Sequence, residues 1–283
     1  MPLVAISAML KHATENRYGV PAINTFNFET VKYAILAAEK AKKPIIVQFY
    51  PGLKEHCPEE VIVAAARAVA KDASVPVALH LDHSATFELA VEGIQKGFDS
   101  VMVDGSSLLY EENVSLTRRV KDVAKVFGCD IEAELGHVGS GSSADDFMKS
   151  DMFTRPDQAL DFVEKTECDA LAIAVGNAHG AYVRTPNLDF DRIAALRAAV
   201  PIPLVMHGCS DIPREQLREA VRLGMSKFNI ATEYFRAMGK LSADLLAGAP
   251  KTDGYGVLTG IGEGMMDFVT EKLELLNPNY TIG

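Results

Sequence analysis

Val77-Ala-Leu-His-Leu-Asp-His-Ser84 begins as an uninterrupted apolar run and ends in an acid that is followed by an imidazole. An uninterrupted run, unlike an alternating one, is typical of a strand that is buried on both faces of a parallel sheet. Asp82 and His83 therefore lie where such a strand ends, and we expect the chain to hold them rigidly there. An Asp-His pair alone has little specificity, so its meaning depends on how the other strands end.

Seven more segments of this kind occur, and most of them end in polar residues. They span residues 20–24, 44–49, 100–105, 130–136, 170–176, 203–208 and 227–232. Helical spacing of apolar residues lies between them, at 30–41, 59–70, 87–95, 113–127, 156–165, 190–199, 213–223 and 233–246. Eight strand–helix units predict an α/β fold, the (β/α)8 TIM barrel, whose usual length is about 250 residues. A doubly wound open sheet is the alternative, although no Gly-x-Gly-x-x-Gly motif supports it.

The whole chain, residues 1–283, is predicted to form a single barrel domain with a C-terminal helical extension. One helix over residues 257–276 would form that extension after a glycine-rich turn. Gly97, Gly128 and Gly224 fall where helix C-caps are expected. The apolar N-terminus has no basic region and no cleavage site, so it is interpreted as a helix capped near Ser7 and not as a signal peptide.

Composition argues against several classes of partner. The net charge of −10 disfavours nucleic acid and anionic membranes, because both require a basic surface. No apolar run is long enough to span a bilayer. The four cysteines are scattered without a Cys-x-x-Cys pair, which indicates reduced thiols in a cytoplasmic protein and not a disulfide framework. A small phosphorylated ligand remains compatible with this charge.

Three of the predicted strands end in a histidine, namely His83, His179 and His207. A TIM barrel places its active site at the carboxyl ends of its strands, so these side chains can converge. Three imidazoles around an open position are typical of catalytic zinc, a Lewis acid that can polarise a carbonyl. Three unrelated hydrogen-bonded histidines are the alternative. The remaining histidines are interpreted as surface or structural residues: His12, His56, His80 and His137.

Small and hydroxyl-bearing residues follow the same strand ends: Gly180, Gly208, Ser210, Asn229 and Thr232. Small residues let backbone N–H groups approach an oxyanion, and the loops after strands 7 and 8 of a TIM barrel often bind phosphate. Ordinary turn chemistry is the alternative.

The longest connection, residues 137–156, is rich in small and acidic residues and is interpreted as a mobile lid, with a surface insertion as the alternative.

Six motifs then follow one another in the chain. They are Leu81-Asp-His83, Val101-Met-Val-Asp104, Glu132-Ala-Glu-Leu-Gly136, Gly176-Asn-Ala-His-Gly-Ala-Tyr182, His207-Gly-Cys-Ser210 and Asn229-Ile-Ala-Thr232. In this order they resemble the motifs of class II ketose-bisphosphate aldolases, and their residues are most similar to those of the tagatose-bisphosphate branch. The likeness extends from Pro21 to about residue 235, so it covers all the predicted strands.

The resemblance implies reversible cleavage of tagatose 1,6-bisphosphate or fructose 1,6-bisphosphate to dihydroxyacetone phosphate and glyceraldehyde 3-phosphate. It implies that His83, His179 and His207 bind Zn²⁺, with Asp104 and Glu134 near an alternative metal position. Asp82 would exchange the proton of the C4 hydroxyl. The implied substrate and phosphate residues are Asn24, Gly180, Gly208, Ser210, Asn229 and Thr232. Some members also bind Na⁺ or K⁺ there, and family habit suggests a homodimer or homotetramer.

The residue chemistry agrees with this resemblance. Retro-aldol cleavage needs a base at the C4 hydroxyl and an electrophile at the C2 carbonyl, where negative charge develops. A class I aldolase would need a lysine at a strand's carboxyl end to form a Schiff base. Lys227 opens the eighth predicted strand and so lies at the wrong end.

Three segments depart from the family pattern. The strand-5 loop usually carries a glutamate that moves the C3 proton, and here only Asp145 and Asp146 offer an acid for such a lid. Tyr50 stands where a small hydroxyl residue is usual. Cys209 and Asp211 replace small residues, and Asp211 would weaken phosphate binding if its carboxylate pointed inward.

These departures leave alternatives open. One is a class II aldolase for a different ketose phosphate, such as a deoxy-keto-sugar acid or a sulfo-sugar phosphate. Another is a catalytically weak homologue that serves as a binding or assembly subunit. A zinc hydrolase would want an acidic or histidine ligand where the chain has Asn24. In every reading Asp82 and His83, as adjacent strand residues, can share one site only if the strand bends or bulges.

Overall fold

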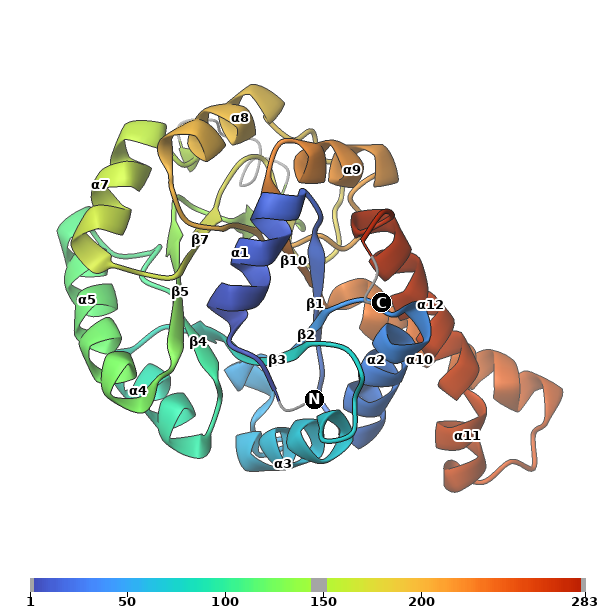
Figure 1. Cartoon of the computed structure of the whole chain (residues 1–283). Helices are drawn as coiled ribbons and strands as arrows, with labels where there is room; N and C mark the ends of the chain where they lie inside the picture. The colour runs from blue at the N-terminus through green and yellow to red at the C-terminus, as the bar shows by residue number, and fades with distance from the viewer. Residues whose placement is uncertain (1–2, 144–151, 281–283) are drawn as a thin grey trace.

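A closed barrel of eight parallel strands forms the centre of the computed structural model, which describes residues 3–143 and 152–280 (Figure 1). The strands, in their order around the barrel, are β1 (Val20–Asn24), β10 (Met225–Ile230), β9 (Leu204–Met206), β7 (Ala170–Ile173), β5 (Asp130–Leu135), β4 (Ser100–Val103), β3 (Val77–Ser84) and β2 (Ile45–Phe49). Closure removes every sheet edge, so the predicted TIM barrel is confirmed and the open sheet is wrong.

Helices alternate with these strands and surround the barrel. They are α2 (Phe28–Ala41), α3 (Glu59–Ala70), α4 (Phe87–Lys96), α5 (Tyr110–Phe127), α7 (Pro156–Thr166), α8 (Phe190–Ala199) and α9 (Arg214–Arg222). A short 3-10 turn, η1 (Pro51–Leu53), follows β2. Gly97 and Gly128 are left-handed C-caps, as expected, because glycine adopts positive φ without strain. No helix of the described chain is long and apolar enough to cross a bilayer.

The first helix, α1 (Ile6–Asn16), lies across the amino-end opening of the barrel. Its apolar face packs on the inward-facing side chains of Ala22, Ile46 and Ala78, which belong to an apolar interior layer. The expected cap at Ser7 is wrong. The helix begins after Ala5 without a side-chain cap, and the Ser7 backbone N–H instead donates to Asp130.

Strand β3 carries the bend that the sequence requires. Its pairing with β4 shifts register between Leu81 and Ser84, and His83 has a φ of 38°. Positive φ is rare for a residue with a side chain, so this backbone is a local distortion that re-aims the strand end. The predicted bulge is confirmed.

Two predicted strand ends are wrong in detail. The sixth strand stops at Ile173, and His179 belongs instead to a separate two-residue strand, β8 (Ala178–His179), which pairs with β6 (Gly139–Ser140). The beginning of the expected mobile lid is thus held in a small sheet above the barrel. At the eighth strand, β10 ends at Ile230, and Thr232 opens helix α10.

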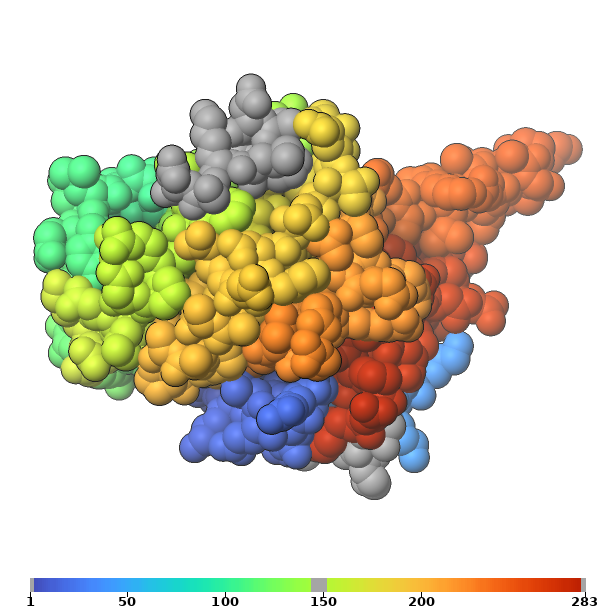
Figure 2. Space-filling view, turned by 90° about the horizontal axis from the view of Figure 1, so that it is seen from above, coloured from blue at the N-terminus to red at the C-terminus, as the bar shows by residue number. Residues whose placement is uncertain are grey.

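The C-terminal extension consists of α10 (Thr232–Gly248), α11 (Gly254–Gly260) and α12 (Gly262–Leu276). The predicted single helix over residues 257–276 is wrong, because Gly260 and Gly262 flank a break at Ile261. Helix α12 packs against α2, whereas the end of α10 and α11 projects away from the barrel, as the orange arm in Figure 2 shows.

Candidate active site

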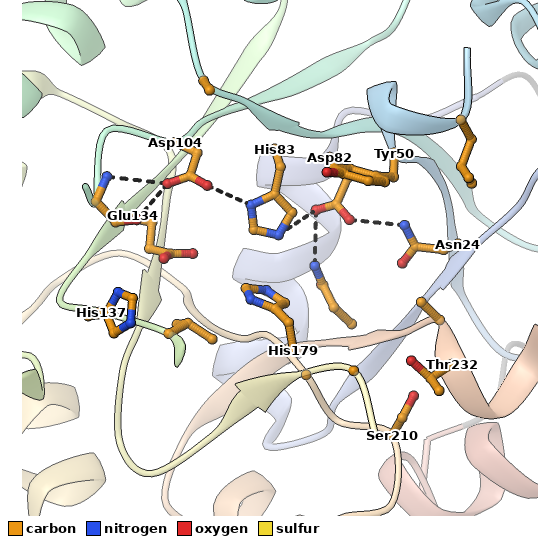
Figure 3. Close-up of a pocket in the computed structure, with 18 of the residues that line it drawn as sticks. Asn24, Tyr50, Asp82, His83, Asp104, Glu134, His137, His179, Ser210 and Thr232 are labelled. Atoms are coloured by element: carbon orange, nitrogen blue, oxygen red, sulfur yellow. Dashed lines mark hydrogen bonds and ion pairs between the residues drawn. The ribbon is translucent and has the colours of Figure 1, made fainter. Parts of the chain in front are cut away.

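A cavity of about 580 Å³ lies at the carboxyl ends of the strands. Figure 3 shows polar side chains from several different strands and loops pointing into it. From the predicted set it is lined by Asn24, Asp82, His83, Asp104, Glu134, His179, Gly180, Gly208, Ser210, Asn229 and Thr232. The structure therefore brings together residues that lie more than two hundred positions apart in the chain. Asp145 and Asp146 lie outside the described residues.

His83, His179 and His207 present one ring nitrogen each to a common point. Nδ1 of His207 lies 3.0 Å from Nε2 of His83 and 3.3 Å from Nε2 of His179. Nitrogens that bind one tetrahedral zinc ion at about 2.0–2.1 Å are separated by about 3.3 Å. The spacing of the three imidazoles therefore fits a single metal ion.

The second nitrogen of each ring is held by another group. Nδ1 of His83 lies 2.8 Å from Asp104, and Nε2 of His207 lies 2.9 Å from Glu132. The His179 ring hydrogen-bonds the backbone of Val138. A neutral imidazole has one N–H and one lone pair, so these partners leave the three lone pairs at the shared point.

The three imidazoles differ in pKa, that is, in how readily each ring takes up a proton. Burial lowers the pKa of His83, but Asp82, Asp104 and Glu134 outweigh it and raise this pKa to about 9. Burial and the charge of His83 lower the pKa of His179 to about 4, and burial holds the pKa of His207 well below its usual range. The carboxylates thus draw one positive charge to the point where the three rings meet.

Asp82 is held at the cavity wall by three amide side chains. Its Oδ2 accepts hydrogen bonds from Asn24 at 2.9 Å and Gln48 at 3.4 Å, and its Oδ1 accepts one from Asn229 at 3.3 Å. Burial raises the pKa of Asp82, but the charges of His83 and neighbouring groups and the hydrogen bond from Asn24 leave it below its usual value. Asp82 is therefore an ionised, buried acceptor, 3.7 Å from Nε2 of His83.

Asp104 and Glu134 form a second possible ligand group with His83. Burial and the charge of Asp104 raise the pKa of Glu134 to about 8. Although burial acts against it, the hydrogen bonds from His83 and Ser106 hold the pKa of Asp104 well below its usual range. Glu134 lies 3.7 Å from Nδ1 of His207, so the two positions are adjacent in one polar wall.

Gly208 and Ser210 lie where backbone and hydroxyl donors can meet an anion beside the start of α10. Gly208 has a φ of 62°, and a Cβ there would lie 1.8 Å from the Ala178 carbonyl oxygen, so only glycine fits. Thr232 begins α10, and the N-terminus of a helix is favourable for phosphate. The backbone N–H of Glu233 already donates to Ser210.

Asp211 does not face this pocket. Its carboxylate pairs with Arg236 at 2.5 and 2.6 Å, and it does not line the cavity. The expected penalty from an inward-pointing Asp211 is therefore absent from the described site. Cys209 is buried, and its thiol contacts the carbonyl of Met206.

Some lining residues were missed by sequence reasoning. His137, interpreted as a surface or structural residue, lines the cavity, as do Leu53, Val138 and Phe235. None of these four ends a barrel strand, so the strand-end rule could not identify them. His80 matches its structural interpretation: it is fully buried inside the barrel, and its Nδ1 lies 2.9 Å from Ser100.

Known proteins share both this sequence pattern and this architecture. The family model of class II fructose-bisphosphate aldolases matches residues 4–279. The crystal structure of the YdjI aldolase from Escherichia coli K12 is 32% identical, with 97% of each chain covered and a TM-score of 0.86. The fructose-bisphosphate aldolase from Campylobacter jejuni is similar in fold, with 23% identity, 98% of this chain and 96% of that chain covered, and a TM-score of 0.83.

Proposed function

The chain belongs to the family of class II fructose-bisphosphate aldolases, and on this premise we propose that it reversibly cleaves a ketose 1-phosphate to dihydroxyacetone phosphate and an aldehyde. Tagatose 1,6-bisphosphate and fructose 1,6-bisphosphate, which would yield glyceraldehyde 3-phosphate, are the first substrates to test. The single observation that carries the proposal is that ionised Asp82 lies at the cavity wall beside His83 and His179, whose ring nitrogens meet that of the fully buried His207.

Zn²⁺ would be held by His83, His179 and His207, because their free nitrogens have the spacing of a tetrahedral site. When bound there, such an ion supplies an electrophile for the C2 carbonyl. Asp104 and Glu134, together with His83, would offer an alternative metal position beside it.

Asp82 would move the proton of the C4 hydroxyl as the C3–C4 bond breaks or forms. Its amide partners Asn24, Gln48 and Asn229 keep one orientation of the carboxylate while leaving it at the cavity wall. A buried carboxylate that is already ionised can accept this proton without first losing its own. The acid that serves C3 is proposed to be Asp145 or Asp146.

The phosphate of dihydroxyacetone phosphate would bind between the loops that follow β9 and β10, the seventh and eighth strands of the barrel. The proposed contacts are Gly180, Gly208, Ser210, Asn229 and Thr232, with Asn24 on the substrate hydroxyls. The start of α10 supports this location, because the N-terminus of a helix carries partial positive charge. A Na⁺ or K⁺ ion beside the phosphate would further balance the acidic wall.

The charge of the pocket favours a second candidate, a ketose monophosphate whose aldehyde half carries no phosphate. Among the described residues that line the cavity, Asp82, Asp104 and Glu134 are acidic and none is lysine or arginine. A second phosphate would need a cationic partner, whereas Tyr50 and Leu53 offer an aromatic ring and an apolar side chain. Deoxy-keto-sugar acids and sulfo-sugar phosphates test whether another anion is accepted in its place.

We further propose a homo-oligomer, a dimer or a tetramer, in a reducing cytoplasmic location. Of the seventeen residues of α10 only Tyr234 is buried, and Tyr255 on the projecting arm is 79% exposed. Exposed apolar side chains on such an arm are typical of an interface. The four cysteines are free and buried, which supports a reducing compartment.

The experiment has two parts, both with zinc-loaded protein. Exchange of the C3 hydrogen of dihydroxyacetone phosphate with deuterium, followed by NMR, tests the half-reaction that every candidate substrate shares. Release of dihydroxyacetone phosphate from a panel of ketose phosphates then identifies the aldehyde. Absence of both reactions would reject the enzyme and favour a binding or assembly subunit.

A further inference from the structure

A chain of buried charged groups runs from His207 into the barrel interior, away from the cavity. Nε2 of His207 lies 2.9 Å from Oε1 of Glu132, and Oε2 of Glu132 lies 2.9 Å from Nζ of Lys227. All three side chains are fully buried. Neither Glu132 nor Lys227 lines the substrate cavity, so the proposed chemistry gives them no direct role.

A layer of polar side chains inside the barrel is unusual for a TIM barrel, whose interior is normally filled by branched apolar residues. The layer below it consists of Ala22, Ile46, Ala78 and neighbouring apolar residues, as expected for a packed barrel core. Because strand side chains alternate, the residues two positions further, Asn24, Gln48 and His80, lie on the same inward face, and all three are polar.

Stability alone gives no reason for the pair. Removing two charges from water costs several kcal/mol per ion, and buried ion pairs are often replaced by apolar residues with no loss of stability. His80 adds little compensation, because its Nε2 is 3.7 Å from Glu132 and burial holds its pKa well below the usual range. The carboxylate of this ion pair instead contacts one atom of the proposed metal site, Nε2 of His207.

We propose that Lys227 and Glu132 are positioning residues that fix the ring orientation and tautomer of His207. Glu132 accepts the N–H of Nε2, which leaves the lone pair on Nδ1, the atom that faces His83 and His179. The Lys227 ammonium forms an ion pair with the other carboxylate oxygen at 2.9 Å and so opposes rotation of Glu132 away from His207. The inference rests on the proposed metal site, and it assigns Lys227 to metal affinity instead of Schiff-base chemistry.

The test compares metal affinity with apoprotein stability in an apolar double variant, Lys227→Met/Glu132→Leu. Competition with a chromophoric chelator measures Zn²⁺ affinity, the absorption spectrum of the Co²⁺-loaded protein reports ligand geometry, and thermal melting reports stability. We expect the Zn²⁺ dissociation constant to rise about 10–100-fold, as is typical when a partner of a metal ligand is lost. The apoprotein melting temperature should stay equal or rise.

Lys43→Met is the matched control, because Lys43 is also buried but lies at the other end of the barrel. Its Nζ donates to the Asn277 carbonyl at 2.6 Å, so the substitution should lower the melting temperature and leave Zn²⁺ affinity unchanged. Lys227→Arg should retain most of the affinity, because it keeps the charge. The single variant Lys227→Met, which removes only the charge, replaces the double variant if the latter does not fold.

Two results overturn the inference: wild-type Zn²⁺ affinity in a folded variant that lacks the Lys227 charge, or an equal loss of affinity in Lys43→Met. A wild-type protein that binds no Zn²⁺ would instead reject the metal site of the proposed function. The two failures are therefore distinguishable.

Discussion

Asp82 and His83 are neighbours in one strand, yet both line the same cavity, with Oδ1 of Asp82 3.7 Å from Nε2 of His83. Regular strand residues at adjacent positions face opposite sides of the sheet. The φ of 38° at His83 and the register shift against β4 remove that alternation. A backbone distortion thus places the proposed proton acceptor beside the proposed metal ligand.

Asp82→Asn should lower kcat for ketose phosphate cleavage by about 10²–10⁴-fold, because the amide cannot accept the C4 proton. Deuterium exchange of dihydroxyacetone phosphate should persist, since that half-reaction involves no C4 hydroxyl. Steady-state cleavage and NMR exchange on the same preparation check this. Parallel loss of both reactions would show that Asp82 acts on binding or on the metal site.

Asp211→Asn should change KM for the ketose phosphate less than about twofold, because Arg236 already neutralises the carboxylate. It also serves as the matched control for Asp82→Asn. The asparagine tolerates the left-handed backbone at this position, where φ is 63°. A large fall in KM would mean that Asp211 repels the substrate after all.

His179→Ala should abolish stoichiometric Zn²⁺ binding and with it cleavage, and a chelator should do the same reversibly to the wild type. Two imidazoles alone leave the tetrahedral site short of protein ligands. Metal analysis after dialysis and recovery of activity on adding Zn²⁺ measure this. His12→Ala, which alters an exposed histidine outside the cavity, should retain both metal and activity.

Gly208→Ala should destabilise the protein more than Gly180→Ala, although both glycines have positive φ. A Cβ at Gly208 would overlap the Ala178 carbonyl at 1.8 Å, next to His179, whereas a Cβ at Gly180 meets nothing within 4 Å. Gly180→Ala should therefore cost only the backbone term of about 1–2 kcal/mol. Denaturant unfolding of the two variants compares them, and equal losses would contradict this packing.

Tyr50→Arg should raise the ratio of kcat/KM for a ketose 1,6-bisphosphate to that for the matching 1-phosphate by about tenfold or more. The tyrosine is 45% exposed and lines the cavity, so an arginine there can reach a second phosphate. Tyr50→Gln, which adds no charge, is the control. A wild type that already prefers the bisphosphate would reject the monophosphate candidate.

Barrel topology and most of the site follow from local pattern. Uninterrupted apolar runs such as 170–175 are typical of strands covered on both faces. Eight such segments separated by amphipathic helices leave a closed barrel as the simplest arrangement. Because all parallel strands end at one face, Asp82, Asp104 and Asn229 could be placed in one site before any contact was known.

Other features depend on contacts between distant segments. His179 lies beyond its barrel strand and is positioned by β6–β8 pairing, which no local periodicity predicts. The direction of the Asp211 carboxylate could be judged only from its partner, because Arg236 lies 25 positions later in the sequence, beyond α9 and β10. The sequence by itself determined the barrel, its acidic character and the residue types at the strand ends. Only the tertiary structure decided which ring nitrogens of the three histidines meet. It also decided that Glu132 contacts His207 and pairs with Lys227, since side-chain direction and burial arise from packing.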